Sequence, residues 1–87
     1  MSIPDKIRQD AKDRDLRVTV RIGKDGVTDN LISEMEQQLK ARNLVKVKMN
    51  RGLFDRQERL EVWDAIAEAC SAVVVDSRGN VAVFYRT

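Results

Sequence analysis

The sequence predicts one small α/β domain in which three helices and a four-stranded mixed sheet form two layers. The chain has 87 residues, which is the length of a single domain. Apolar residues alternate or cluster in four segments and recur at intervals of three or four residues in three others, so the predicted order is α-β-α-β-α-β-β. Each strand-helix-strand unit favours a right-handed parallel crossover, and the last two strands favour an antiparallel hairpin.

Composition limits the class of protein. No segment has the roughly 20 consecutive apolar residues of a membrane-spanning helix, and the N-terminal residues run directly into charge rather than into a signal-peptide core. We therefore expect a cytoplasmic protein without membrane contacts. Cys70 is the only cysteine and histidine is absent, so the sequence predicts no disulfide and no metal site. The glycine spacings of Walker and dinucleotide-binding loops are also absent, and we expect no cofactor.

A helix within residues 1–16 and a strand that ends at Gly23 are expected first. Ser2 is a candidate helix cap, and apolar residues follow it at the four-residue spacing of one helix face. From residue 17 onward polar and apolar residues alternate, which predicts a strand with one buried side. That buried side consists of Val18, Val20 and Ile22.

A second helix is expected from Thr28 to Arg42, followed by a second strand from Leu44 to Met49. Thr28 has the side chain of a helix N-cap, and Asn43 is suited to stop the helix. The polar positions of the strand are basic. The predicted buried face of the helix consists of Leu31, Ile32, Met35 and Leu39.

The second half of the chain predicts a helix and a closing hairpin. A connector over residues 51–54 leads to a third helix that begins at Asp55. Two strongly apolar runs, Ala72–Val75 and Val81–Tyr85, are the predicted last strands, and residues 76–80 have the composition of a hairpin loop. The predicted buried stripe of the third helix consists of Leu60, Trp63, Ile66, Ala67 and Cys70.

Basic residues are concentrated in the middle of the chain. The net charge is only +2, but no acidic residue lies between Glu36 and Asp55. Such a local excess attracts a polyanion, although a solvated surface is the alternative interpretation. The basic residues of this block are Lys40, Arg42, Lys46, Lys48 and Arg51. If the first two strands turn their apolar sides to the helices, the opposite face carries Arg17, Thr19, Arg21, Lys46 and Lys48.

The most informative local feature is Gly23-Lys24-Asp25-Gly26, placed between a strand and a helix. Its two glycines permit backbone angles that other residues resist, so amide groups at the start of the helix can face a phosphate. Lys24 adds a mobile positive charge. A KH-like GxxG loop of this kind clamps the backbone of single-stranded RNA, although the same spacing also occurs in ordinary turns.

Further features agree with this loop. Residues 22–28 hold the GxxG loop with a following hydrophobic residue and threonine, and residues 44–49 form a basic second strand. Together with Ala65-Ile66, Gly79 and Val83–Arg86, they resemble the CRM domain (chloroplast RNA splicing and ribosome maturation) of YhbY-like RNA-binding proteins. The resemblance is weaker over residues 1–16, but we expect one such domain over residues 1–87.

The resemblance implies a non-catalytic protein of ribosome biogenesis that binds ribosomal RNA or a pre-ribosomal particle, with possible protein partners on the ribosome. One departure from the family is Asp25, which places a carboxylate inside the loop. Asp25 either points away and holds the turn by an Asx-type hydrogen bond, or weakens phosphate binding. The expected RNA-binding residues are Gly23, Lys24, Asp25, Gly26, Thr28, Arg21, Lys46, Lys48, Arg51 and Arg86.

The sequence bears on two other classes of function. An enzyme is not expected, because the chain lacks histidine, an activated nucleophile and a cluster of metal ligands. A protein-protein adaptor is the alternative, in which acidic helix faces bind a basic partner and the glycine loop is only a turn. Those faces contain Glu34, Glu36, Glu58, Glu61 and Glu68.

Overall fold

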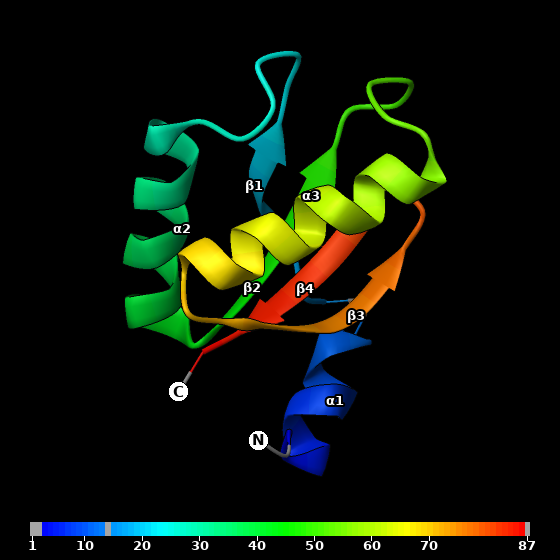
Figure 1. Ribbon diagram of the computed structural model, residues 1–87. Helices are drawn as coiled ribbons and strands as arrows, with labels where there is room; N and C mark the ends of the chain where they lie inside the picture. The colour runs from blue at the N-terminus through cyan, green and yellow to red at the C-terminus, as the bar shows by residue number, and fades with distance from the viewer. Residues whose placement is uncertain (1–2, 14, 87) are drawn as a thin grey trace.

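A computed structural model describes residues 3–13 and 15–86 of the protein. Within these residues the elements follow the predicted order (Figure 1). They are α1 (Asp5–Ala11), β1 (Val18–Ile22), α2 (Asp29–Arg42), β2 (Leu44–Met49), α3 (Arg56–Ala69), β3 (Val73–Arg78) and β4 (Val81–Tyr85). Ser2, the predicted helix cap, lies outside the described residues. Among the helices described, none has the length and apolar character needed to cross a membrane.

The strands form one mixed sheet in the order β1-β2-β4-β3. β1 and β2 are parallel and are connected through α2, whereas β4 runs antiparallel to both β2 and β3. The predicted α/β fold with a four-stranded mixed sheet is therefore confirmed. Because β1 and β2 run in the same direction, the loops that follow them leave the sheet at the same edge. Figure 1 shows these two loops side by side at the top of the molecule.

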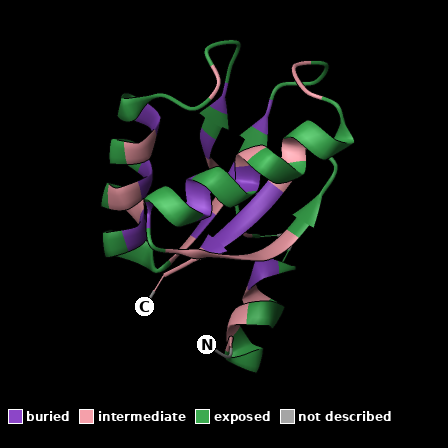
Figure 2. Cartoon of the chain, viewed as in Figure 1, coloured by how far each residue is buried: buried purple, intermediate pink, exposed green. Residues whose placement is uncertain are grey.

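The apolar core lies between the sheet and the two longer helices, α2 and α3. Figure 2 shows buried positions along β4 and on the sides of these helices that face the sheet. The rings of Trp63 and Phe84 meet edge to face at the centre, with centroids 6.0 Å apart and planes inclined by 68°, a favourable aromatic geometry. The other core residues are Val20, Ile22, Leu31, Met35, Leu39, Val45, Val47, Met49, Ile66, Ala67, Cys70 and Ala82.

The short helix α1 packs on the opposite face of the sheet, so the molecule is not simply two-layered. Ala11 of α1 and Val83 of β4 are buried, at 3% and 2% exposure, and both line a pocket on that face. Val83 alternates along β4 with core residues that point toward α2 and α3. α1 therefore covers part of the face that the sequence predicted to be an open basic surface.

A β-bulge in β1 changes which residues share a face. The register shifts between Val18 and Val20, and Val18 pairs with Lys46 instead of with a core residue. The prediction that Val18 faces the helices is therefore wrong, because a bulge inserts one residue and reverses the alternation beyond it. Thr19 also departs from its predicted place on an open basic face. Its hydroxyl is buried, and its carbonyl oxygen accepts a hydrogen bond from Gln38 of α2 at 3.4 Å.

The closing hairpin is tighter than predicted. β3 extends to Arg78, and only Gly79 and Asn80 separate it from β4, so the predicted loop over residues 76–80 is wrong. Gly79 has a φ of +54°, which suits the two-residue turns that match the twist of paired strands. A second bulge shifts the register between Val74 and Asp76.

Candidate nucleic-acid interface

The Gly23–Gly26 segment forms a tight, exposed turn directly after β1. The amide of Gly26 donates to the carbonyl oxygen of Gly23 at 3.0 Å, and Gly26 has a φ of +68°. The side chains of Lys24 and Asp25 are exposed at the tip. The turn therefore presents its backbone and one ammonium group to solvent, beside a carboxylate.

A second loop, residues 50–54, lies against this turn. The amide of Asn50 donates to the carbonyl oxygen of Ile22 at 3.0 Å, which continues the parallel pairing beyond the strands. A Cβ atom added to Gly26 would lie 3.8 Å from the Phe54 ring, so the ring packs beside the turn. The exposed Arg51 belongs to the same loop. We call the Gly23–Gly26 turn and residues 50–54 together the loop edge.

Thr28 caps the helix that follows the turn. Its hydroxyl oxygen accepts from the amide of Leu31 at 3.1 Å, as the sequence predicted for an N-cap. The positive end of the α2 dipole lies at this point, and Asp29 adds a negative charge in the first turn. The cap fixes the direction in which α2 leaves the loop edge.

Exposed cations lie in one row across the open face of the sheet. The register pairs Arg21 with Lys48, Lys48 with Val81, and Val81 with Arg78. Directly paired residues point to the same side of a sheet, and here that side is the one away from α2 and α3. Arg21, Lys48 and Arg78 are all exposed. We call these three residues and Val81 the cationic row.

The cationic row borders the loop edge. Arg21 is two residues before the Gly23–Gly26 turn, and Lys48 is two residues before Asn50. The structure therefore brings together the backbone of a glycine turn and a line of positive charge, which are two different means of holding phosphate.

Arg78 is a member of the row that the sequence reasoning missed. The composition of residues 76–80 predicts a hairpin loop there, whereas Arg78 is the last residue of β3. The dipeptide Gly79-Asn80 held the necessary signal, because a Gly-Asn pair between two strand-forming runs is typical of a two-residue hairpin turn. The Nε atom of Arg78 lies 3.9 Å from Asp76, and its side chain is 79% exposed, so the guanidinium group is held only weakly.

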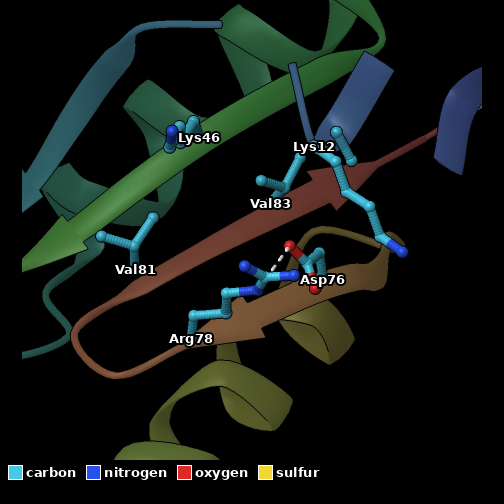
Figure 3. Close-up of a pocket in the computed structure, with 7 residues that line it drawn as sticks. Lys12, Lys46, Asp76, Arg78, Val81 and Val83 are labelled. Carbon is cyan, nitrogen blue, oxygen red and sulfur yellow. Dashed lines mark ion pairs between the residues drawn. The ribbon is translucent and has the colours of Figure 1, made fainter. Parts of the chain in front are cut away.

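Lys46 occupies a different environment from Lys48. Lys46 is half-buried and lies in the row of paired residues next to the cationic row, on the same face of the sheet. Its Nζ atom donates to the carbonyl oxygen of Leu16 at 3.3 Å. Figure 3 shows Lys46 on β2 beside the valines of β4, at a pocket that α1 helps to form. Lys46 therefore belongs to the pocket under α1, not to the loop edge.

Arg86 is not brought together with the loop edge. Its amide donates to the carbonyl oxygen of Asn43 at 2.9 Å, at the end of the sheet where β2 begins. Burial raises the pKa of the Cys70 thiol, Glu36 raises it further, and the positive charge of Arg86 opposes both. Cys70 is thus a buried, protonated thiol at neutral pH. In the described part of the chain, no cluster of three or more potential metal ligands occurs.

Residues 5–86 match the CRS1/YhbY (CRM) domain family. The chain belongs to the CRM domain family. The predicted resemblance to this family is thereby confirmed over residues 5–86.

Relatives of this CRM domain are named as RNA-binding proteins. It is 36% identical over 76 residues to a probable RNA-binding protein of Methanocaldococcus jannaschii, a match that covers 87% of this chain and 56% of that relative. The chain thus spans little more than half of the archaeal protein. An RNA-binding protein of Haemophilus influenzae is 31% identical over 71 residues, covering 82% of this chain and 70% of that relative.

A solved structure has the same fold as this CRM domain. The solution structure of a hypothetical protein from Staphylococcus aureus superimposes with a TM-score of 0.74 at 25% sequence identity. The match covers 99% of this chain and 90% of the other. The arrangement of helices and strands is therefore shared well beyond the loop edge.

Proposed function

We propose that this CRM domain binds RNA at the loop edge and the cationic row, without catalysing a reaction. The observation that carries the proposal is the strand register, which aligns Arg21, Lys48 and Arg78 in one row that begins next to the glycine turn. Phosphates of a single strand can then contact backbone amides at the turn and side-chain cations along the row. The names of the relatives support RNA as the polyanion.

The expected residues contribute in different ways under this proposal. Gly23 and Gly26 let the RNA backbone approach, Lys24 and Arg51 contact phosphate from the loops, and Thr28 positions α2. Asp25 is exposed at the tip, where its carboxylate can turn to solvent and leave the phosphates to the backbone and Lys24. Lys46 and Arg86 act at a distance from the loop edge, through the long-range positive field.

The proposed RNA is ribosomal RNA or a pre-ribosomal particle, and the proposed place of action is the cytoplasm, during ribosome maturation. This part of the proposal rests on the family resemblance. Crosslinking in cells, followed by identification of the attached RNA, tests it. Recovery of ribosomal RNA precursors supports it, and recovery of unrelated RNA contradicts it.

Charge reversal tests the binding surface. Lys24→Glu with Lys48→Glu should weaken binding of a short single-stranded RNA by more than about tenfold, because two phosphate contacts become repulsive. Fluorescence anisotropy measures the affinity. The matched control is Lys6→Glu with Lys40→Glu, which changes the charge equally at exposed lysines of α1 and α2, outside the loop edge and the row.

The comparison of the two double variants decides the proposal. The control should bind within about threefold of the unmodified protein, since screening at physiological salt limits the effect of distant charges. Equal losses in both double variants would mean that net charge governs the affinity and that the proposed surface is wrong.

A further inference from the structure

A pocket of about 300 Å³ lies between α1 and the open face of the sheet, next to the cationic row. Figure 3 shows Val81 and Val83 of β4 beneath it, with Asp76 and Arg78 of β3 at one side and Lys46 of β2 at the other. Val81 and Arg78 belong to both the pocket and the row. Any group in the pocket therefore lies directly beside the proposed path of the RNA backbone. The pocket is lined by Ala11, Lys12, Lys46, Asp76, Arg78, Val81 and Val83.

The bulge in β3 places Asp76 in this pocket. Val74 packs against the core, and regular alternation would turn the side chain two residues later to the same side. The register instead shifts after Val74, so Asp76 pairs with Val83 on the open face. Bulges re-aim side chains in this way and are common at functional sites. The Asp76 side chain is only 25% exposed, and its one described ion pair, at 3.9 Å to Arg78, leaves its oxygens able to accept further hydrogen bonds.

The pocket combines three kinds of surface. Val81 is partly exposed and provides an apolar surface on which a flat ring can pack, whereas the buried Val83 and Ala11 close the base of the pocket. Asp76 supplies only hydrogen-bond acceptors, whereas Lys46 and Arg78 supply only donors. Lys46 uses one of its three donors on Leu16, which fixes its position and leaves the others free. The volume is at the lower end of the range for small-molecule sites, which suits one base rather than a whole nucleotide.

We propose that this pocket receives one unstacked guanine base of the bound RNA. The proposal rests on the RNA-binding function above and adds to it a preference for one base. Guanine presents two adjacent N–H donors on one edge, at N1 and at the 2-amino group, and a carboxylate accepts such a pair through both oxygens. Its O6 and N7 atoms are acceptors, which match the donors of Lys46 and Arg78.

The other bases fit the pocket less well. Adenine and cytosine each offer Asp76 one amino group beside a ring nitrogen that is an acceptor, and this acceptor faces the second carboxylate oxygen. Uracil offers a single N–H between two carbonyl groups. Each of these bases leaves a polar group of the pocket unpaired or opposed, which favours guanine over the other bases.

The test compares short oligouridines that carry guanosine, inosine, adenosine or cytidine at one central position. Fluorescence anisotropy with the full chain should show about tenfold tighter binding of the guanosine RNA, in line with one bidentate contact to a base. Inosine, which lacks the 2-amino group, should lose most of this advantage. In Asp76→Asn the preference should disappear, while the affinity for plain oligouridine is kept or increased because a negative charge has been removed.

The control is Asp64→Asn, which removes the same charge from an exposed position on α3 and should keep the preference for guanosine. Unfolding midpoints of both variants establish that they fold. Guanosine monophosphate at the concentration of the RNA should not displace it, because it lacks the flanking phosphates. Full displacement would identify a free-nucleotide site and contradict the RNA assignment.

Two failures are distinguishable. If oligouridine binds but the central base has no effect, or if Asp76→Asn keeps the preference, the guanine pocket is wrong and the RNA-binding surface stands. If none of these RNAs binds the unmodified protein, the proposed function fails, and the guanine pocket fails with it.

Discussion

At the scale of single residues, the two glycines of the Gly23–Gly26 turn have different roles. Gly26 has a φ of +68°, a conformation that residues with a Cβ atom resist. Gly23 lies outside that region, and a Cβ atom added to it would meet only Asn50, at 3.9 Å. Gly26 is therefore required by the shape of the turn, whereas the shape of the turn does not require Gly23, whose part under the proposed function is to let the RNA approach the backbone.

Alanine substitutions separate these roles. Gly26→Ala should lower the free energy of unfolding by about 1 to 2 kcal/mol, the cost of a left-handed conformation for a residue with a side chain. Gly23→Ala should change it by less than about 0.5 kcal/mol and should weaken RNA binding instead. Urea denaturation measures both variants. Equal stability losses would contradict the assignment.

At the scale of elements, short features at strand and helix ends determine which residues lie on the open face of the sheet and at the loop edge. The bulge in β3 turns Asp76 to the open face, and the N-cap at Thr28 sets where α2 begins. In α3, Asp55 and Glu58 form a capping box, so one of the acidic residues that the adaptor alternative requires is engaged in holding the helix. The bulge and the two helix caps each involve only a few neighbouring residues, but they decide which side chains reach a surface that several elements form together.

The cap of α2 can be tested directly. Thr28→Ala removes the acceptor for the Leu31 amide and should lower the free energy of unfolding by about 1 kcal/mol. Thr28→Ser keeps a hydroxyl oxygen and should retain most of that stability. Thermal or urea denaturation provides the comparison. If the serine variant is as unstable as the alanine variant, the cap is not the source of the effect.

At the scale of the whole molecule, the distribution of charge matters more than its total. The net charge is only +2, yet the exposed cations Arg21, Lys48 and Arg78 share one row. Lys24 lies next to that row at the loop edge. A protein that is nearly neutral overall therefore has one surface suited to a polyanion.

This distribution predicts the salt dependence of RNA binding. Four phosphate contacts to single-stranded RNA correspond to a slope of about −2.8 in a plot of log affinity against log salt concentration. The affinity should then fall about fiftyfold between 50 and 200 mM salt. Lys24→Glu with Lys48→Glu should reduce the steepness of the slope by about half. A slope near zero would contradict phosphate binding.

The sequence predicted much of the fold because the elements depend on local patterns. Apolar periodicity placed the helices and strands, and the cap at Thr28 and the turn at Gly23–Gly26 were correctly predicted. The candidate site was predicted less completely. Alternation has a period of two, so one bulged residue reverses every later side chain. The prediction for Val18 is wrong because of the bulge in β1. The prediction for Arg78 is wrong because the hairpin loop is shorter than its composition predicts.

The sequence by itself determined the order of the elements, the sheet-forming segments other than the second half of β3, and the glycine turn, since each follows from residues close together in the chain. Only the tertiary structure decided which basic residues lie together. It aligned Arg78 with Lys48 across β4, placed Lys46 under α1 and left Arg86 at the other end of the sheet. The physical reason is that strand register and helix docking are set by contacts between distant parts of the chain, which local periodicity does not encode.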